Sequence, residues 1–186
     1  MLKKVLIGAG IIVIIVVGYM AYSFMTTKSH SPKDVATYER NGLKISLTYC
    51  QPFKKERLIF GKADDGALVP YSEKWRTGAN EATEITFNKD LKIKGKLLKA
   101  GSYSIYTIPG EKEWTIVFNS KLDYWGAKPG GSPFEEELDV LRVKVPAESM
   151  PKELEQLTID FRKSGKAINL RLRWDKTKVI LPLKIS

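Results

Sequence analysis

The chain has 186 residues, a formal net charge of +10, one cysteine and one histidine. The single Cys50 excludes an intramolecular disulfide framework. His30 lies near the N-terminus, so the rest of the chain lacks the histidines that zinc sites and Ser-His-Asp or Cys-His catalysis require. We therefore expect no metal and no cofactor, and acid-base chemistry would fall to Asp, Glu, Lys or Tyr.

Residues 5–25 form an uninterrupted apolar run without a charge. A helix of that length rises roughly 30 Å, which matches the hydrocarbon thickness of a bilayer. Lys3 and Lys4 belong to a stub, 1–4, which the positive-inside rule places in the cytoplasm. We predict a single-pass inner-membrane protein with a periplasmic C-terminal domain. The alternative is secretion after signal cleavage, although the run is longer than the ~7–15 apolar residues of a signal peptide.

The polar segment 26–36 contains Pro32 and is predicted to be a tether. Residues 37–186 are then about 150 residues, enough for one domain with its own core. The basic charge suits the membrane surface, an acidic glycan or an envelope protein, and it is also compatible with solvated surface lysines alone. A location outside the cytoplasm argues against nucleic acid. The oligomeric state is left open.

Apolar and polar residues alternate with period two along most of the domain, which predicts half-buried strands. The predicted strands are 43–49, 85–87, 91–97, 103–108, 114–118, 141–145, 157–162, 168–174 and 179–185. Asn41-Gly42 is a turn signal and 109–112 predicts a hairpin. Only 72–75 and 134–138 are candidates for short helices.

Many short strands with one apolar face cannot close a core as a single flat sheet. We therefore predict an all-β, antiparallel β-sandwich of jelly-roll type, or a flattened barrel, preceded by one transmembrane helix.

The segment 75–83 is the most unusual part of the domain, because it gathers ligand-binding residue types around Gly78 and Ala79. Arg76 offers bidentate donors for a carboxylate or phosphate, and amide and carboxylate side chains can bond sugar hydroxyls. The candidate binding residues in this segment are Trp75, Arg76, Asn80, Glu81 and Thr83. The structural alternative is that Arg76 and Glu81 satisfy each other in a turn while Trp75 fills the core.

The chain resembles the uncharacterised bacterial family known as domain of unknown function 2911, from Ser31-Pro32 to the C-terminal strands. The matching runs are 68–71, 75–83 and 95–104, then Ile108-Pro109, Trp114 and Trp125-Gly126. Tyr49 and Arg57 fit an earlier part of the pattern, but Gln51 stands where an arginine is expected and Glu56 replaces a glycine. The resemblance implies a shared fold and no particular reaction, and it adds Tyr49 and Arg57 to the candidates.

The four tryptophans fall into two kinds. Trp114 and Trp174 occupy apolar positions of alternating strands, which predicts burial. Trp125 lies in a loop region and is the better candidate for a surface that stacks against a ligand.

Three functions are compatible with the sequence. The first is a non-catalytic envelope module that binds a glycan or a small polar ligand. The second is a carboxylate-dependent enzyme acting on envelope glycans, in which Glu81 would need a second acid ~5–10 Å away. The third is a structural envelope-assembly protein, which an exposed apolar patch would favour.

Overall fold

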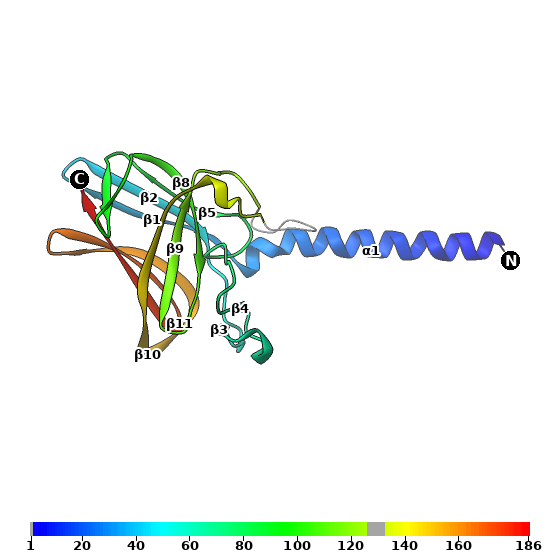
Figure 1. Ribbon diagram of the computed structural model, residues 1–186. Coiled ribbons are helices and arrows are strands. Elements are labelled where there is room, and N and C mark those ends of the chain that lie inside the picture. Colours follow the sequence, from blue (N-terminus) through cyan, green and yellow to red (C-terminus); the bar gives the residue numbers. More distant parts are fainter. Residues whose placement is uncertain (1, 126–132) are drawn as a thin grey trace.

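The computed structural model describes residues 2–125 and 133–186, and within the first helix it places the side chains of residues 8, 10–22 and 26–30. Helix α1 (Leu2–His30) projects from one end of a body made of strands (Figure 1). In chain order the strands are β1 Lys33–Arg40, β2 Leu43–Cys50, β3 Phe60–Gly61, β4 Val69–Pro70, β5 Thr83–Phe87, β6 Leu91–Ile93, β7 Lys96–Leu98, β8 Gly101–Ile108, β9 Glu113–Asn119, β10 Asp139–Ser164 and β11 Ala167–Ile185.

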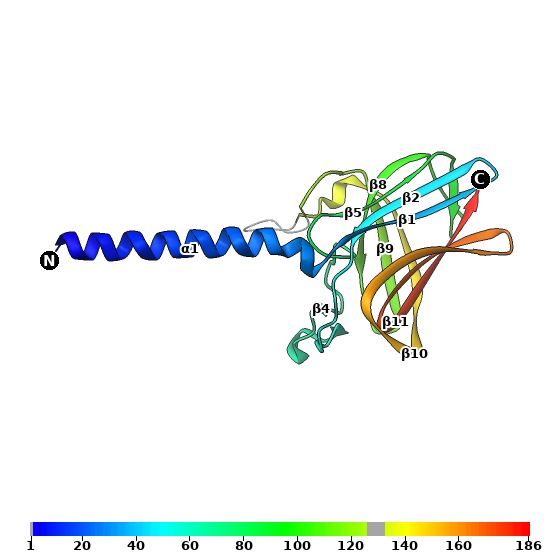
Figure 2. The same cartoon turned by 180° about the vertical axis from the view of Figure 1, so that it is seen from behind.

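Nine of these strands form one antiparallel sheet with the order β1-β2-β5-β8-β9-β10-β11-β6-β7. The sheet does not close into a barrel, and it is continuous rather than divided into the two separate sheets of a jelly roll. A short parallel pair, β3 and β4, stands apart from it. The all-β antiparallel prediction is confirmed, and the architecture is sandwich-like because the sheet bends over its own core (Figure 2).

The bend is carried by the two longest strands. β10 pairs with β9 as far as Pro146 and with β11 from Ala147 onward, and the register of the β10–β11 pair shifts between Ser149 and Thr158. In β11, Pro182 falls between the residues paired with β10 and those paired with β6. A proline cannot donate to a ladder, so this unpaired position accommodates it.

The core lies between the two halves of the bent sheet, and the period-two pattern places its residues correctly. In β2 every second residue from Leu43 to Tyr49 is buried. Trp114 and Trp174 are buried as predicted, and the 109–112 hairpin joins β8 to β9.

Three local predictions differ from the structure. Residues 26–36, predicted as a tether, are divided between the end of α1 and the start of β1. β1 is an edge strand exposed along most of its length, so no alternation marks it in the sequence. Residues 72–75 are not helical, because Trp75 pairs with Thr107 instead. In the other predicted helix, only Glu136–Leu138 forms a turn of 3-10 helix.

The apolar run lies within α1, and its described side chains from Ile11 to Tyr22 are exposed. A search of the described residues for a helix both long and apolar enough to cross a membrane finds none.

Candidate functional site

The segment 75–83 is attached to the core through Trp75. Its main chain exchanges two hydrogen bonds with Thr107 of β8, at 2.7 and 2.8 Å. Its ring stacks on Trp174 at 5.9 Å between centroids and meets Phe60 and Trp114 edge-on. Such aromatic contacts fix the ring in one orientation. The residue that follows, Arg76, therefore starts from a rigid position.

The backbone after Arg76 is held in an unfavourable conformation. Thr77 and Asn80 have φ angles of 60° and 56°. A positive φ is rare for any side chain other than glycine and is a marked outlier for a β-branched one. Thr77 is fully buried, and its carbonyl accepts a hydrogen bond of 3.0 Å from the Thr83 hydroxyl. Strain that is maintained in this way is typical of binding and active sites.

Close packing against β2 and α1 completes the support of the segment. A Cβ atom added to Gly78 would lie 2.9 Å from the carbonyl oxygen of Cys50, so only glycine fits there. The side-chain amide of Asn80 donates to the carbonyl oxygen of Ser31, just after α1, at 3.4 Å.

Two pockets open beside this segment. One, which we call the arginine pocket, has a volume of about 390 Å³ and is lined by His30, Ser31, Pro52, Lys55, Arg57, Leu68, Val69, Trp75, Arg76, Gly78, Ala79 and Trp174. The other, the acidic pocket, has a volume of about 300 Å³ and is lined by Lys33, Thr48, Tyr49, Cys50, Glu81, Ala82, Glu84, Asp123, Tyr124 and Trp125.

Arg76 is half-buried in the arginine pocket and has no carboxylate partner among the residues that the structure describes. Within the part of the chain that the structure describes, its only hydrogen bond runs from a guanidinium nitrogen to the carbonyl oxygen of Asn80, at 3.4 Å. Burial lowers the pKa of Arg76, because water is removed from the cation and no anion replaces it. The guanidinium stays charged at neutral pH, since arginine titrates far above it.

Three further cationic or basic side chains line the same pocket. Arg57 donates to the carbonyl oxygens of Lys54 and Phe53 at 2.9 and 2.5 Å, which fixes its guanidinium. Lys55 Nζ lies 3.3 Å from His30 Nδ1. An ammonium group has no acceptor, so Lys55 donates and Nδ1 accepts in this contact.

The wall that carries Lys55 is strained in the same way as the segment 75–83. Lys55 and Glu56 have consecutive positive φ angles of 48° and 59°. Glu56 stands where the family pattern has glycine, and its φ angle explains why a glycine suits the position. None of the residues lining the arginine pocket is acidic, so the pocket has the charge of an anion site.

The acidic pocket has the opposite character. Glu81 forms an ion pair of 3.3 Å with Lys28 of α1 and accepts a hydrogen bond from the Cys50 thiol. Burial acts to raise the pKa of Glu81, but its hydrogen bonds and Lys28 outweigh burial and lower it. The Glu84 carboxylate accepts a hydrogen bond of 2.7 Å from the backbone of Asp123. Burial, the largest cause, and the neighbouring Glu81 carboxylate raise the pKa of Cys50.

The structure thus separates the predicted site residues. Trp75, Arg76 and Arg57 line the arginine pocket, whereas Tyr49, Glu81 and Trp125 line the acidic pocket. Asn80 and Thr83 line neither pocket and support the backbone. In the structural alternative, the pairing of Arg76 with Glu81 is wrong, because Glu81 pairs with Lys28, whereas the packing of Trp75 against the core is confirmed.

Tyr49 and Trp125 differ in what remains available to a ligand. The Tyr49 hydroxyl is bonded to Asp34, Gln51 and the backbone of Ile159, and burial, the largest cause, raises its pKa to about 12. Trp125 is 38% exposed, as expected for a loop position. Its neighbour Gly126, with the rest of 126–132, lies outside the described residues.

Several lining residues, some of them charged, were not among the candidates drawn from the sequence. His30 and Lys55 belong to the arginine pocket, and Glu84 and Asp123 to the acidic pocket. His30 was assigned to a tether, and the others carry no local motif. The run of basic residues around Arg57 was the only signal that could have drawn attention to Lys55.

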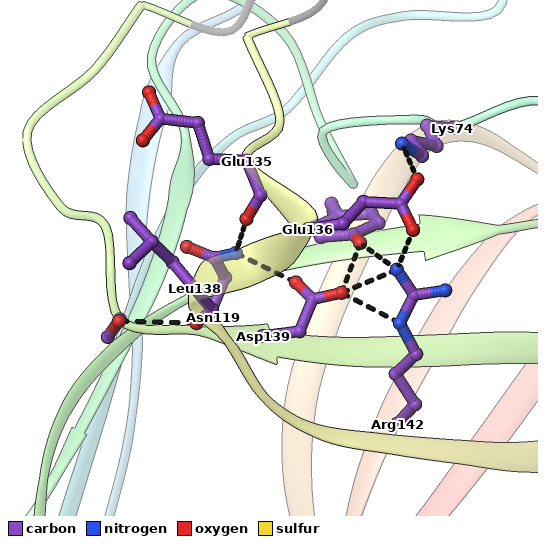
Figure 3. Close-up of polar contacts among 9 residues, drawn as sticks. Lys74, Asn119, Glu135, Glu136, Leu138, Asp139 and Arg142 are labelled. Carbon is purple, nitrogen blue, oxygen red and sulfur yellow. Dashed lines mark hydrogen bonds and ion pairs between the residues drawn. The ribbon is translucent and has the colours of Figure 1, made fainter.

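A third charged cluster shows what a fully paired arginine looks like in this protein (Figure 3). Arg142 donates to Asp139 and Glu136 at 2.5 Å each and to the Tyr106 hydroxyl at 3.0 Å. Lys74 also pairs with Glu136. We call this set the Arg142 cluster. Burial, followed by the bond to Asp139, raises the pKa of Tyr106, so the phenol stays protonated.

No group of three or more His, Cys, Asp or Glu side chains is arranged to hold a metal ion in the part of the chain that the structure describes.

The fold and the pockets define a class of protein: a sandwich-like antiparallel β-domain with a basic pocket where its N-terminal helix joins it. The chain belongs to the family described as "Protein of unknown function (DUF2911)", whose model matches residues 31–183. The match begins directly after α1 ends at His30. No curated protein and no solved structure matches the chain.

Proposed function

We propose that this protein is a membrane-anchored, periplasmic, non-catalytic module that binds a small anionic ligand in the arginine pocket. The observation that carries the proposal is the half-buried Arg76, which has no carboxylate partner among the described residues. A buried cation without an anion is costly, and natural folds rarely retain one without a use.

The chemistry of the pocket favours a carboxylate or a phosphate. A planar guanidinium binds either group through two parallel hydrogen bonds. Lys55 and Arg57 add positive charge at the rim, and Trp75 supplies a rigid aromatic wall. The volume of about 390 Å³ suits a ligand of a few non-hydrogen atoms up to a monosaccharide derivative.

Anchoring is supported by the sequence of α1 and by its surface. The large apolar side chains of residues 11–22 are between 50% and 72% exposed. Soluble proteins rarely leave an apolar surface of this extent uncovered, and lipid would cover it. Lys3 and Lys4 before the run orient the domain to the periplasm under the positive-inside rule.

The binding proposal can be tested on the full chain in detergent micelles. Inorganic phosphate and a set of simple carboxylates would be titrated while chemical shifts of the tryptophan indoles are followed by NMR. We expect saturable shifts of Trp75, and Arg76→Met should weaken binding at least about tenfold. Arg162→Met removes the same charge from an exposed position of β10 and should leave binding unchanged. Equal loss in both variants, or no saturable binding, would refute the proposal.

The orientation has its own test. Protease added to intact spheroplasts should digest the β-domain, and complete protection would place it in the cytoplasm.

One observation favours the second candidate function, a carboxylate-dependent enzyme. Glu81, Glu84 and Asp123 line one pocket together with Trp125, so Glu81 has acidic neighbours. The lowered pKa of Glu81 suits a base or nucleophile rather than a general acid. Release of reducing ends from envelope glycans that is abolished in Glu81→Gln and retained in Arg76→Met would support this function over the first.

A further inference from the structure

The arginine pocket is built partly from the end of α1, so its place relative to that helix is fixed. His30 and Ser31 line it, and Asn80 bonds to Ser31. On the other side of the segment 75–83, Lys28 pairs with Glu81. The end of the helix therefore lies against the β-domain (Figure 1), with Lys28 bonded to Glu81 and Ser31 to Asn80.

This attachment sets the depth of the pocket if α1 spans a bilayer. The apolar run ends at Met25, and His30 lies five residues further along the helix. At ~1.5 Å per residue, that is about 7–8 Å beyond the hydrocarbon core. The headgroup layer of one leaflet is roughly 5–7 Å thick. His30, and with it the mouth of the pocket, therefore lies at about the outer edge of the lipid headgroup layer.

The residues around the mouth of the arginine pocket also suit a lipid. Lys55 and Arg57 are exposed, and Leu68 is an exposed apolar residue of the same pocket lining. A phosphate with attached acyl chains would meet cations in the pocket and an aliphatic side chain at its edge. Long basic side chains are also favourable at a membrane interface.

We propose that the ligand of the arginine pocket is the phosphate of an anionic phospholipid in the outer leaflet of the membrane that anchors the chain. This inference rests on the proposed anion-binding function and names the source of the anion. The phosphate replaces the water that Arg76 loses on burial, and Lys55 and Arg57 add to the attraction. A zwitterionic headgroup is disfavoured because its own ammonium competes for the phosphate.

The test uses the full chain in nanodiscs of phosphatidylcholine with a minority of phosphatidylglycerol. Native mass spectrometry after transfer to detergent counts the phosphatidylglycerol that stays bound. We expect the wild type to retain it and to discriminate against phosphatidylcholine. Arg76→Met and Lys55→Met should each reduce retention at least about tenfold, whereas Arg162→Met should retain as much as the wild type. Circular dichroism checks that each variant is folded.

A second arm separates the lipid from a free anion. Glycerol phosphate, the soluble headgroup, is titrated against the same protein in neutral detergent. Binding of glycerol phosphate without retention of phosphatidylglycerol would overturn the lipid assignment and leave the proposed function standing. Failure to bind either would overturn both. Retention that all the variants share would show only a general attraction of anionic lipid to a basic protein, and would also overturn the assignment.

Discussion

The protein surrounds Arg142 and Arg76 in opposite ways: Arg142 is exposed and paired, whereas Arg76 is half-buried and has no carboxylate partner among the described residues. Arg142 is bonded to two carboxylates and a phenol in the Arg142 cluster, and every one of these partners is also held by another group. Arg76 has one long bond to a carbonyl oxygen. The first arrangement is complete without a ligand and stabilises the fold. The second arrangement leaves N–H donors of the Arg76 guanidinium available to a ligand, as a binding site requires.

The two pockets differ in the same way as the two arginines. The acidic pocket carries three carboxylates, but Lys28 and the Cys50 thiol already engage Glu81. The arginine pocket has only basic and neutral lining residues. A ligand that enters it gains electrostatic energy that the fold itself does not supply.

The largest expected loss of stability comes from removing Arg142, and removing Arg76 provides the contrast. Arg142→Met should lower the free energy of unfolding by about 2–3 kcal/mol, because the Asp139 carboxylate, only 7% exposed, loses its cation. Arg76→Met should change stability by no more than about 1 kcal/mol, since a cation without an anion contributes little to the fold. Urea denaturation of both variants measures this. A loss of stability in Arg76→Met as large as that in Arg142→Met would contradict the prediction, because Arg76 would then stabilise the fold as Arg142 does.

A smaller effect is expected at Gly78, which lets the segment 75–83 pack against β2. Gly78→Ala places a methyl group 2.9 Å from a backbone oxygen, and we expect a loss of about 1–2 kcal/mol together with weaker anion binding. Gly18→Ala in α1 is the matched control, because an added Cβ there meets nothing within 4 Å. Thermal unfolding of both variants tests the prediction, and an unchanged melting temperature in Gly78→Ala would contradict it.

The two arginine environments also differ in how they affect the pH dependence of stability. Hydrogen bonds from Lys74 and Arg142 lower the pKa of Glu136, and that of Asp90 is lowered chiefly by the backbone of Ala100, with Lys99 second. A lowered folded-state pKa gives stability that is present above the unfolded value of about 4 and is lost as the pH falls below it. The arginine pocket has no carboxylate to contribute to this loss.

We therefore expect the melting temperature to fall from about pH 4 downward and Glu136→Gln to make that fall shallower. Glu137→Gln, one residue further on, serves as the control because Glu137 forms no ion pair among the described residues. Differential scanning calorimetry across this range is the measurement. If the melting temperature falls with pH equally steeply in Glu136→Gln and in the wild type, Glu136 does not contribute to the acid sensitivity.

The smallest effect is expected at the Thr77–Thr107 contact, where two hydroxyls meet at 3.2 Å. Thr107→Val should cost about 1 kcal/mol in unfolding free energy, because the buried Thr77 hydroxyl then loses a partner. If the strained backbone depends on this contact, anion affinity should fall as well. If stability falls as expected but anion affinity is unchanged, Thr107 stabilises the fold and does not support the binding site.

Much of the fold was predictable because a strand with one buried face has alternating apolar and polar residues, a pattern that is visible in the local sequence. The strands of the core, such as β2 and β9, have that pattern and were predicted. β1 lies at the edge with both faces largely exposed, so it has no pattern to detect. Separate predicted strands at 141–145 and 157–162 are one bent strand, β10, because alternation is interrupted where it changes partner from β9 to β11.

The candidate site was predictable only in part. The residue types of 75–83 marked the segment, but they did not show that Arg76 and Glu81 face different pockets. His30, Lys55 and Arg57 come from other segments and reach Arg76 only through the attachment of α1 and the loop after β2.

Composition and local pattern were enough to show the apolar N-terminal run and the alternating strands, because each depends on neighbours a few residues apart. The tertiary structure alone decided that the sheet bends without closing, that Arg142 is neutralised while Arg76 is not, and that the basic pocket lies against the end of α1. Those features depend on which distant groups meet, and no local pattern encodes that.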